Sequence, residues 1–401
     1  MQTRAASADH TANRKRALVL GGGFAGVEAA TELAKDGGFD VTLVSDRDYL
    51  FLFPVSVWIP VRTLPFRSAQ VSLHEVARKR GFRLVIDPVR EISHADRLVR
   101  GAEGTYAYDY LVVATGAAKL KPQGVEHTLS ICGGPQAGLD IRERLDALIA
   151  KGSGTIAVGF GGNPKDRSAV RGGPAFELLF NIHELLKRRK LRDRFELVFF
   201  APMAEPGERM GPRALSMLDS MLRSTSIPKR VGVPIAAFDE QGVAFTDGTR
   251  LDADLVLFIP GAAGHPVVAS SDLPRNEAGF VRIDDTGLVE GTTDIYAVGD
   301  VAALEGPEWR AKQGHTAEVM ARNAAFNILA TEAGRPGRKG YQEHLAIMCL
   351  MDTGNGAAMV YRGHTRNIVI PLPVIGHWFK QAWGRYARAT KLGRIPRVPG
   401  L

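Results

Sequence analysis

The sequence predicts an α/β fold in which two strand–helix–strand units precede an amphipathic C-terminal region. Three observations predict it. Residues 16–46 read as a strand, a glycine-rich turn, an alanine-rich helix and a second strand; residues 105–118 and 287–304 are buried-strand patterns; and residues 374–401 carry aromatic side chains at helical spacing. The 401 residues suffice for about two to three domains. No run of about 20 apolar residues predicts a spanning helix.

The first unit contains the motif Gly21-x-Gly23-x-x-Gly26 between a strand and a helix. Gly21 permits the tight turn, Gly23 lets a pyrophosphate approach the backbone, and Gly26 allows the helix to pack closely on the strand. The phosphates are then expected at the helix N-terminus, at Phe24 and Ala25. This context favours a Rossmann-like dinucleotide site over a glycine-rich surface turn.

The end of the second strand departs from the usual dinucleotide pattern. The position that commonly carries a ribose-binding acid holds Ser45, followed by Asp46. We include both residues among the expected cofactor contacts.

Two later motifs identify the dinucleotide. One strand ends in Ala114-Thr115-Gly116 and another in Gly299-Asp300. With the first turn, these motifs resemble the flavoprotein superfamily with two dinucleotide domains that glutathione reductase typifies. The resemblance covers residues 16–327 and implies FAD as cofactor. It places the Ala-Thr-Gly segment over the FAD and assigns Asp300 to the ribityl or pyrophosphate part.

In the second unit, an insertion interrupts the glycine-rich turn. A strand at 155–158 leads to Gly159 and to Gly161-Gly162, but the insertion NPKDRSAVR follows before Gly172-Gly173-Pro174. In the superfamily, this turn binds the nicotinamide cofactor. The insertion moves the helix start away from the turn, so we expect NAD(P)H binding to be lost. The alternative is a turn that bulges and still binds NADH.

Several further segments are similar to the sulfide:quinone oxidoreductase family, over nearly the whole chain. They are VSDRDYLFLFPVSVW, SICGGPQA, GGPAFE, IPGAAGHPVV, KQGHTAEVMARNAA and CLMDTGNGAAMVYRG. The resemblance implies that sulfide, or a related sulfur species, passes electrons through cysteines and FAD to a quinone. It also implies that the C-terminal region associates with the membrane.

The family pattern of three cysteines is incomplete. Cys132 matches the first and Cys349 the last, while Arg171 stands where the middle cysteine is expected. Glu177 matches the family's acidic position near the flavin, but the expected histidine is absent from AEPGERMGPRAL. Three hypotheses stay open: Cys132 and Cys349 act as a substitute pair, Cys349 acts alone, or the donor is another compound. For each cysteine, a small apolar core residue is the structural alternative.

The helix from about His315 is expected to aim its N-terminus at the flavin, where a positive dipole stabilises the reduced ring. Lys312, just before it, is included among the cofactor contacts, with a solvated lysine as the alternative. No cluster of residues predicts a metal site.

The C-terminal tail is strongly basic. Residues 361–401 contain eight basic residues and no acidic one, which equals the net charge of +8 of the whole chain. Aromatic residues recur at helical spacing between Trp378 and Tyr386, and Lys380, Arg385, Arg388 and Lys391 are expected on the other side, which predicts an interfacial helix. A helix packed on the domain or on a partner of a homo-oligomer is the alternative. No motif predicts nucleic-acid binding.

The predicted domains are an FAD-binding domain at 14–150 and 268–340, a second Rossmann-like domain at 151–267, and a C-terminal region at 341–401. The predicted function is a peripheral, FAD-dependent sulfide:quinone oxidoreductase on the cytoplasmic side of the membrane. A type II NADH:quinone oxidoreductase and a non-catalytic flavin-binding relative are the alternatives.

Overall fold

A five-stranded parallel sheet combines four strands from the first 113 residues with one strand from residues 295–297. The computed structural model describes residues 14–35 and 37–397. The strand order is β19-β9-β1-β2-β5, and every neighbouring pair is parallel. The bounds are β1 Lys15–Leu20, β2 Phe39–Ser45, β5 Arg83–Ile86, β9 Tyr110–Val113 and β19 Ile295–Ala297. All four residues of β9 are buried, as expected for a strand covered on both faces.

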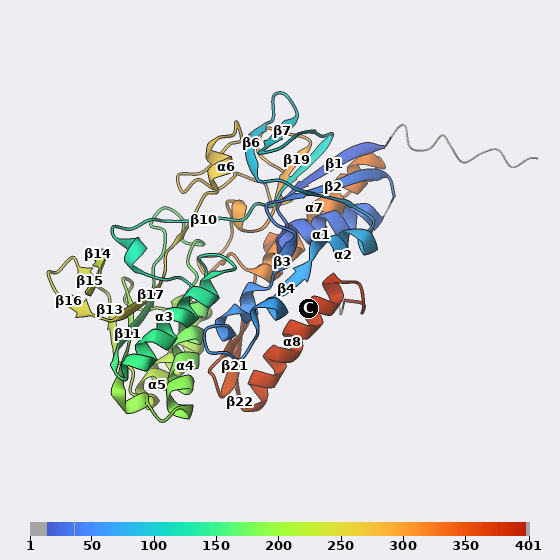
Figure 1. Cartoon of the computed structure of the whole chain (residues 1–401). Helices are drawn as coiled ribbons and strands as arrows, with labels where there is room; N and C mark the ends of the chain where they lie inside the picture. The colour runs from blue at the N-terminus through green and yellow to red at the C-terminus, as the bar shows by residue number, and fades with distance from the viewer. Residues whose placement is uncertain (1–13, 36, 398–401) are drawn as a thin grey trace, which may run out of the picture.

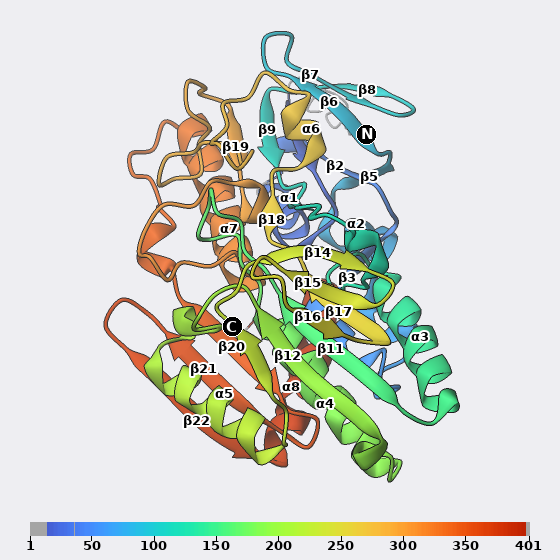
Figure 2. The ribbon, with the colours of Figure 1, turned by 90° about the vertical axis from the view of Figure 1, so that its left-hand side faces the viewer.

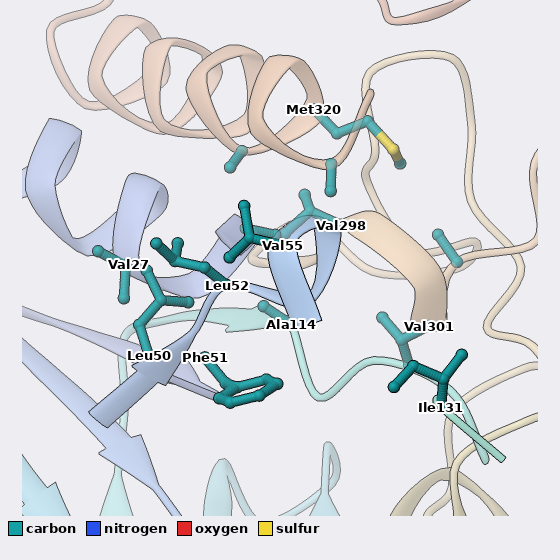
Figure 3. Packing of buried hydrophobic residues seen from close by; sticks show 14 of the residues in the cluster. Val27, Leu50, Phe51, Leu52, Val55, Ala114, Ile131, Val298, Val301 and Met320 are labelled. Atoms are coloured by element: carbon teal, nitrogen blue, oxygen red, sulfur yellow. The ribbon is translucent and has the colours of Figure 1, made fainter. Parts of the chain in front are cut away.

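Helices α1 (Phe24–Lys35) and α7 (Gly314–Glu332) pack against each other beside this sheet (Figure 1). They come from opposite ends of the chain. Figure 3 shows the core at this junction, where Val27 of α1 and Met320 of α7 lie near Ala114 and Val298 at the strand ends. The residues beyond the strand ends are thereby held in place by buried apolar contacts.

A second parallel sheet has the order β13-β12-β11-β17. Its strands are β11 Gly154–Phe160, β12 Phe195–Ala201, β13 Lys229–Val231 and β17 Leu255–Ile259. The larger helices of this part are α3 Ala137–Lys151, α4 Gly173–Arg188 and α5 Pro212–Ser224 (Figure 2). Both predicted parallel units are therefore present.

A three-stranded antiparallel sheet and one long helix complete the chain. The strands are β20 Ile347–Asp352, β21 Gly356–Arg362 and β22 Asn367–Pro373, and helix α8 (Ile375–Lys391) packs on them. Figure 1 shows α8 running from this sheet toward α2 (Leu73–Arg80). Residues 398–401 of the predicted C-terminal region lie outside the described residues.

Small elements connect these layers. The remaining bounds are β3 Tyr49–Phe51, β4 Gln70–Ser72, β6 Val89–Ser93, β7 Leu98–Gly101, β8 Thr105–Ala107, β10 Ala118–Lys119, β14 Ile235–Asp239, β15 Gly242–Phe245, β16 Arg250–Asp252, β18 Ala262–Ala263 and α6 Pro266–Ala269. The antiparallel pair β10–β18 joins the segment after β9 to the segment after β17. Within the described residues, no helix combines the length and apolar character needed to cross a membrane.

Candidate active site

The turn between β1 and α1 has the geometry that its glycines predict. Gly21 has a φ of +106°, and a Cβ there would lie 2.4 Å from the carbonyl oxygen of Ala114. A Cβ on Gly26 would lie 1.8 Å from the carbonyl oxygen of Gly21, so Gly26 is required for helix–turn packing. In contrast, a Cβ on Gly23 would meet nothing within 4 Å. The backbone at Gly23 is therefore open to a ligand, and the first turn of α1 faces the same space.

A cavity of about 1500 Å³ begins at this turn and extends to the C-terminal sheet. Most of the predicted cofactor residues line it. They are Gly21, Gly23, Phe24, Ala25, Asp46, Ala114, Thr115, Gly116, Gly299, Asp300 and Lys312. The predicted catalytic residues Cys132, Glu177 and Cys349 line the same cavity. Segments that are far apart in the sequence thus meet around one space.

Two predicted contacts do not line the cavity. Gly26 is buried against Gly21 and contributes through packing. Ser45 is 1% exposed and its hydroxyl donates to the carbonyl oxygen of Arg47 at 2.7 Å. Ser45 therefore closes a turn, and the ion pair of Asp46 with Arg47, at 2.8 Å, lines the cavity at this point.

The residues present fit a dinucleotide such as FAD. Thr115, which lines the cavity, has a buried hydroxyl oxygen without a hydrogen-bond partner in the described part of the chain. Helix α7 begins at Gly314 without a side-chain cap, and its first residues line the cavity. The open backbone at Gly23 and the N-termini of α1 and α7 supply donors for phosphate and ring oxygens. A bound dinucleotide would satisfy these groups.

The second glycine turn does not form a comparable phosphate cradle. Residues 161–172 separate β11 from α4. The side chain of Asn163 donates to the carbonyl oxygen of Ala262 at 2.9 Å, and the carbonyl oxygen of Ala169 accepts from the amide of Ala262 at 3.0 Å. Ala169 also packs in a small apolar cluster with Phe280. The inserted loop is therefore folded down over the end of β17, and α4 starts only at Gly173.

The insertion brings Arg171 onto Asp300. Their side chains form an ion pair, with 30% of Arg171 and 23% of Asp300 exposed, and both line the cavity. The charge of Asp300 raises the pKa of Arg171, with a smaller contribution from Cys132. Burial alone would raise the pKa of Asp300, but the charges of Arg171, Lys312 and Lys119 lower it below its ordinary value. The position of the expected middle cysteine thus holds a guanidinium group.

Cys349 lies on β20 beside a different set of charged groups. Nζ of Lys380 is 2.5 Å from Oε2 of Glu177, and both side chains are about 5% exposed. Burial raises the pKa of Glu177, although the charge of Lys380 lowers it. Burial, and then the carboxylate of Glu177, raises the pKa of Cys349 to about 12. Cys349 is therefore a protonated thiol at neutral pH.

A buried polar network extends from Glu177 toward the surface. Oε1 of Glu177 accepts from the amide of Asp352 at 3.1 Å, and Oδ2 of Asp352 lies 2.7 Å from Nδ1 of His377. Nε2 of His377 is 3.0 Å from the side-chain nitrogen of Gln381. Two sets of hydrogen bonds thus meet at Asp352, one through its backbone amide to Glu177 and one through its carboxylate to His377 on α8.

Sequence reasoning missed this network. Lys380 was expected on the solvent face of α8, but it is 4% exposed. Lys391 was also expected there, but it is buried and binds Glu28 and Glu318, each at 2.6 Å. Helical spacing indicates on which side of a helix a side chain lies. It does not show that an acidic residue of another segment packs against that side. One sequence feature could have indicated that Lys380 is buried, because it lies between the aromatic residues Phe379 and Trp383.

The two cysteines are free and have different neighbours. Cys132 lies near Arg171 and Lys119, whereas Cys349 lies near Glu177 and Lys380. The hypothesis of a substitute Cys132–Cys349 pair stays a prediction.

Comparison with known proteins places the chain in a family. The family model for pyridine nucleotide-disulphide oxidoreductases matches residues 15–324. The chain belongs to this family. The sulfide-quinone reductase of Aquifex aeolicus is 25% identical over 93% of this chain and 90% of that protein. A type II NADH:quinone oxidoreductase of Staphylococcus epidermidis is 23% identical over 87% of this chain and 90% of that protein.

The solved structures show the same fold. The sulfide:quinone oxidoreductase of Aquifex aeolicus superposes with a TM-score of 0.85 at 24% identity, covering 94% of this chain and 92% of that one. NDH2 from Plasmodium falciparum in complex with NADH gives a TM-score of 0.76 at 12% identity, covering 95% and 98%. The predicted α/β fold and the resemblance to sulfide:quinone oxidoreductases are confirmed, and FAD is consistent with the family.

Proposed function

We propose that the protein is an FAD-dependent oxidoreductase that passes electrons from sulfide, or a related sulfur species, to a membrane quinone. The single observation that carries the proposal is the cavity in which the Gly21–Gly26 turn, Asp300, Cys132, Cys349 and Glu177 come together. An oxidoreductase of this kind needs a cofactor site, a thiol that handles sulfur and a group that moves protons, all in one place.

The first turn of α1, Thr115 and the first turn of α7 would hold the FAD. When bound, FAD supplies a ring that accepts two electrons from the donor and gives them to the quinone. Asp300 would orient the cofactor, and Arg171 fixes the Asp300 carboxylate in its charged form.

Glu177 would hold and move a proton at the Cys349 side of the cavity. Burial raises its pKa, which makes proton uptake easier than for an ordinary carboxylate, and Lys380 keeps it oriented through the 2.5 Å contact. The backbone amide of Asp352 donates to this carboxyl group, and the carboxylate of Asp352 pairs with His377 of α8, so both contacts hold Glu177 in place. Cys349 would provide the thiol that handles sulfur in the same part of the cavity.

The membrane side of the proposal rests on α8 and its neighbours. Val374, Ile375, Trp378 and Phe379 form an exposed apolar patch, in which Trp378 is 71% exposed. Ile370 of β22 and Met359 of β21 extend it. Exposed aromatic and aliphatic side chains of this kind suit insertion into the headgroup region of a bilayer, so we assign peripheral membrane association to this patch.

Oxidation of NADH is the second candidate function. It is favoured by relatives that are type II NADH:quinone oxidoreductases and by the fold shared with an NADH complex. Against it, residues 161–172 occupy the place where the second glycine turn would meet a helix N-terminus, and the hydrogen bonds to Ala262 hold them there.

An anaerobic titration tests both candidates. Purified flavoprotein is mixed with sulfide in one sample and NADH in another, the flavin absorbance is followed, and a soluble quinone is then added. Bleaching by sulfide and recovery with quinone are expected. Bleaching by NADH alone would assign the protein to the second candidate, and a flavin that neither donor reduces would favour the non-catalytic alternative.

A further inference from the structure

A run of basic residues lies at the C-terminal end of α4, away from the cavity. Residues 187–194 contain six basic residues and one acidic residue. Lys187 and Arg188 belong to the last turn of α4, Lys190 and Arg194 follow it, and all four are exposed. Within the described part of the chain, none of these four side chains forms an ion pair. We call these four residues the α4 basic cluster.

The α4 basic cluster carries more charge than the fold requires. Positive side chains in the last turn of a helix stabilise its negative end, which accounts for the two cluster residues inside α4. Lys190 and Arg194 lie beyond the helix. Arg192 differs from them, because its side chain donates to the carbonyl oxygens of Phe195 and Thr225 and so joins neighbouring segments. The cluster therefore presents positive charge to the surroundings of the protein.

A single turn of chain separates α4 from the start of α8. A Cβ on Gly354 would lie 2.7 Å from Cβ of Glu184 and 3.1 Å from the carbonyl oxygen of Phe180, so the turn between β20 and β21 packs on α4. The amide of Val374 donates to the carbonyl oxygen of Asn355, in the same turn, at 3.2 Å. Val374 immediately precedes α8 and belongs to its exposed apolar patch.

The direction of α4 places the basic cluster on the side of this turn. Lys187 and Arg188 follow Glu184 by three and four residues, so they share its face of the helix, about 5 Å further along. Figure 1 shows α4 and the start of α8 at the same end of the molecule. The basic cluster and the apolar patch are therefore neighbours on one surface.

A second path of contacts joins the same two places. Arg189, at the end of α4, and Arg62 both pair with Asp146 of α3. Arg62 follows Trp58 by four residues, and the ring centre of Trp58 lies 5.2 Å from that of His377 in the first turn of α8. The end of α4 is thus tied to the start of α8 from both sides.

We propose that the α4 basic cluster binds the anionic headgroups of a phospholipid bilayer while the apolar patch at the start of α8 enters the lipid. The inference rests on the proposed function, because it names the lipid class for the membrane association proposed there. Val374 is 65% and Ile375 54% exposed. A nucleic acid or an acidic protein would neutralise the cluster and leave these apolar side chains in water. A bilayer with anionic lipid accepts both, since lysine and arginine side chains reach the headgroups from the level of the apolar residues.

Co-sedimentation of the FAD-loaded protein with vesicles tests the inference. One kind of vesicle is phosphatidylcholine alone, and the other contains phosphatidylcholine and phosphatidylglycerol in equal amounts. We expect the wild type to bind the anionic vesicles at least about tenfold more tightly, with a preference that falls as salt is added. The triple variant Lys187→Gln, Arg188→Gln and Lys190→Gln should bind anionic vesicles at least about tenfold more weakly, because each basic residue near the surface contributes roughly fivefold. Its affinity for the neutral vesicles should not change.

A matched control removes three other positive charges. It changes Arg90, Arg335 and Arg338 to Gln, all of which are exposed, and lowers the net charge by the same amount. Arg90 belongs to β6, which lies at the opposite end of the molecule from α4 (Figure 1). The control variant should keep the preference of the wild type for anionic vesicles.

Three results would overturn the inference. They are equal binding of the wild type to the two kinds of vesicle, an unchanged preference in the triple variant, and equal losses in the triple variant and the control, which would show a response to net charge alone. If the triple variant keeps its preference and loses binding to a duplex oligonucleotide, the cluster belongs to a nucleic-acid site. Binding to neither kind of vesicle would overturn the proposed membrane association as well. Reduction of the flavin by sulfide is scored separately, so failure of the proposed electron transfer remains distinguishable.

Discussion

The environment of Cys349 makes a quantitative prediction about its reactivity. With a pKa of about 12, only about one thiol in ten thousand is ionised near pH 8, compared with about one in eleven at the ordinary value of 9.0. The loss of thiolate is roughly a thousandfold, and the greater nucleophilicity of the more basic thiolate restores about twentyfold. Cys349 should therefore react with iodoacetamide about fiftyfold more slowly than in the unfolded chain.

The assay is alkylation of the FAD-loaded protein at a series of pH values, followed by mass spectrometry of the Cys349 peptide. The rate should keep rising about tenfold per pH unit up to at least about pH 10.5. Glu177→Gln should accelerate alkylation at fixed pH, because the carboxylate of Glu177 raises the pKa of Cys349. The exposed change Glu196→Gln is the control. A rate that levels off near pH 9 would refute the reasoning, since mere shielding lowers the rate without moving the plateau.

Three further changes are predicted. Lys391→Met should lower the unfolding free energy in urea by about 1.5–3 kcal/mol, because Glu28 and Glu318 lose the buried one of their cations and keep Arg397, whereas the exposed change Arg388→Met should have little effect. Burial lowers the pKa of Lys312 from 10.5 to about 8, so between these values the unfolded chain binds more protons and stability rises with pH. Lys312→Met should remove this rise of about 3 kcal/mol from urea titrations of the apoprotein; an unchanged slope would contradict it. The double change Trp378→Ala and Phe379→Ala should weaken co-sedimentation with anionic phospholipid vesicles at least about tenfold, while Ile86→Ala, which also removes an exposed apolar side chain, should not.

The cofactor half of the site could be predicted from sequence because its motifs are local. The Gly21–Gly26 turn needs only a strand before it and a helix after it, and its steric requirements are met within a few residues and at Ala114. The same holds for the displaced start of α4, since an insertion in the sequence is an insertion in the loop.

The charged half could not be predicted in this way. Arg171 and Asp300 are 129 residues apart, and Lys380 and Glu177 are 203 apart. No periodicity links such positions, because their proximity depends on how two sheets and α8 pack. The basic tail illustrates the difference: its charge suggested a solvated face, yet Lys380 and Lys391 are satisfied by acids of α1, α4 and α7.

Helix α8 is held on the protein at two points, by Lys380 on Glu177 and by Lys391 on Glu28 and Glu318. Separating α8 from the protein would leave the charges of Lys380, Glu177 and Lys391 without their partners in a poorly solvating environment. The helix is therefore expected to bind a bilayer as a rigid part of the protein. The ion pairs that attach it then fix how deeply it enters the headgroup region. Val374, Ile375, Trp378 and Phe379 can enter the lipid, while the rest of the helix stays seated on the protein. The distance from the membrane surface to the cavity would then be a constant of the fold, unaffected by lipid composition.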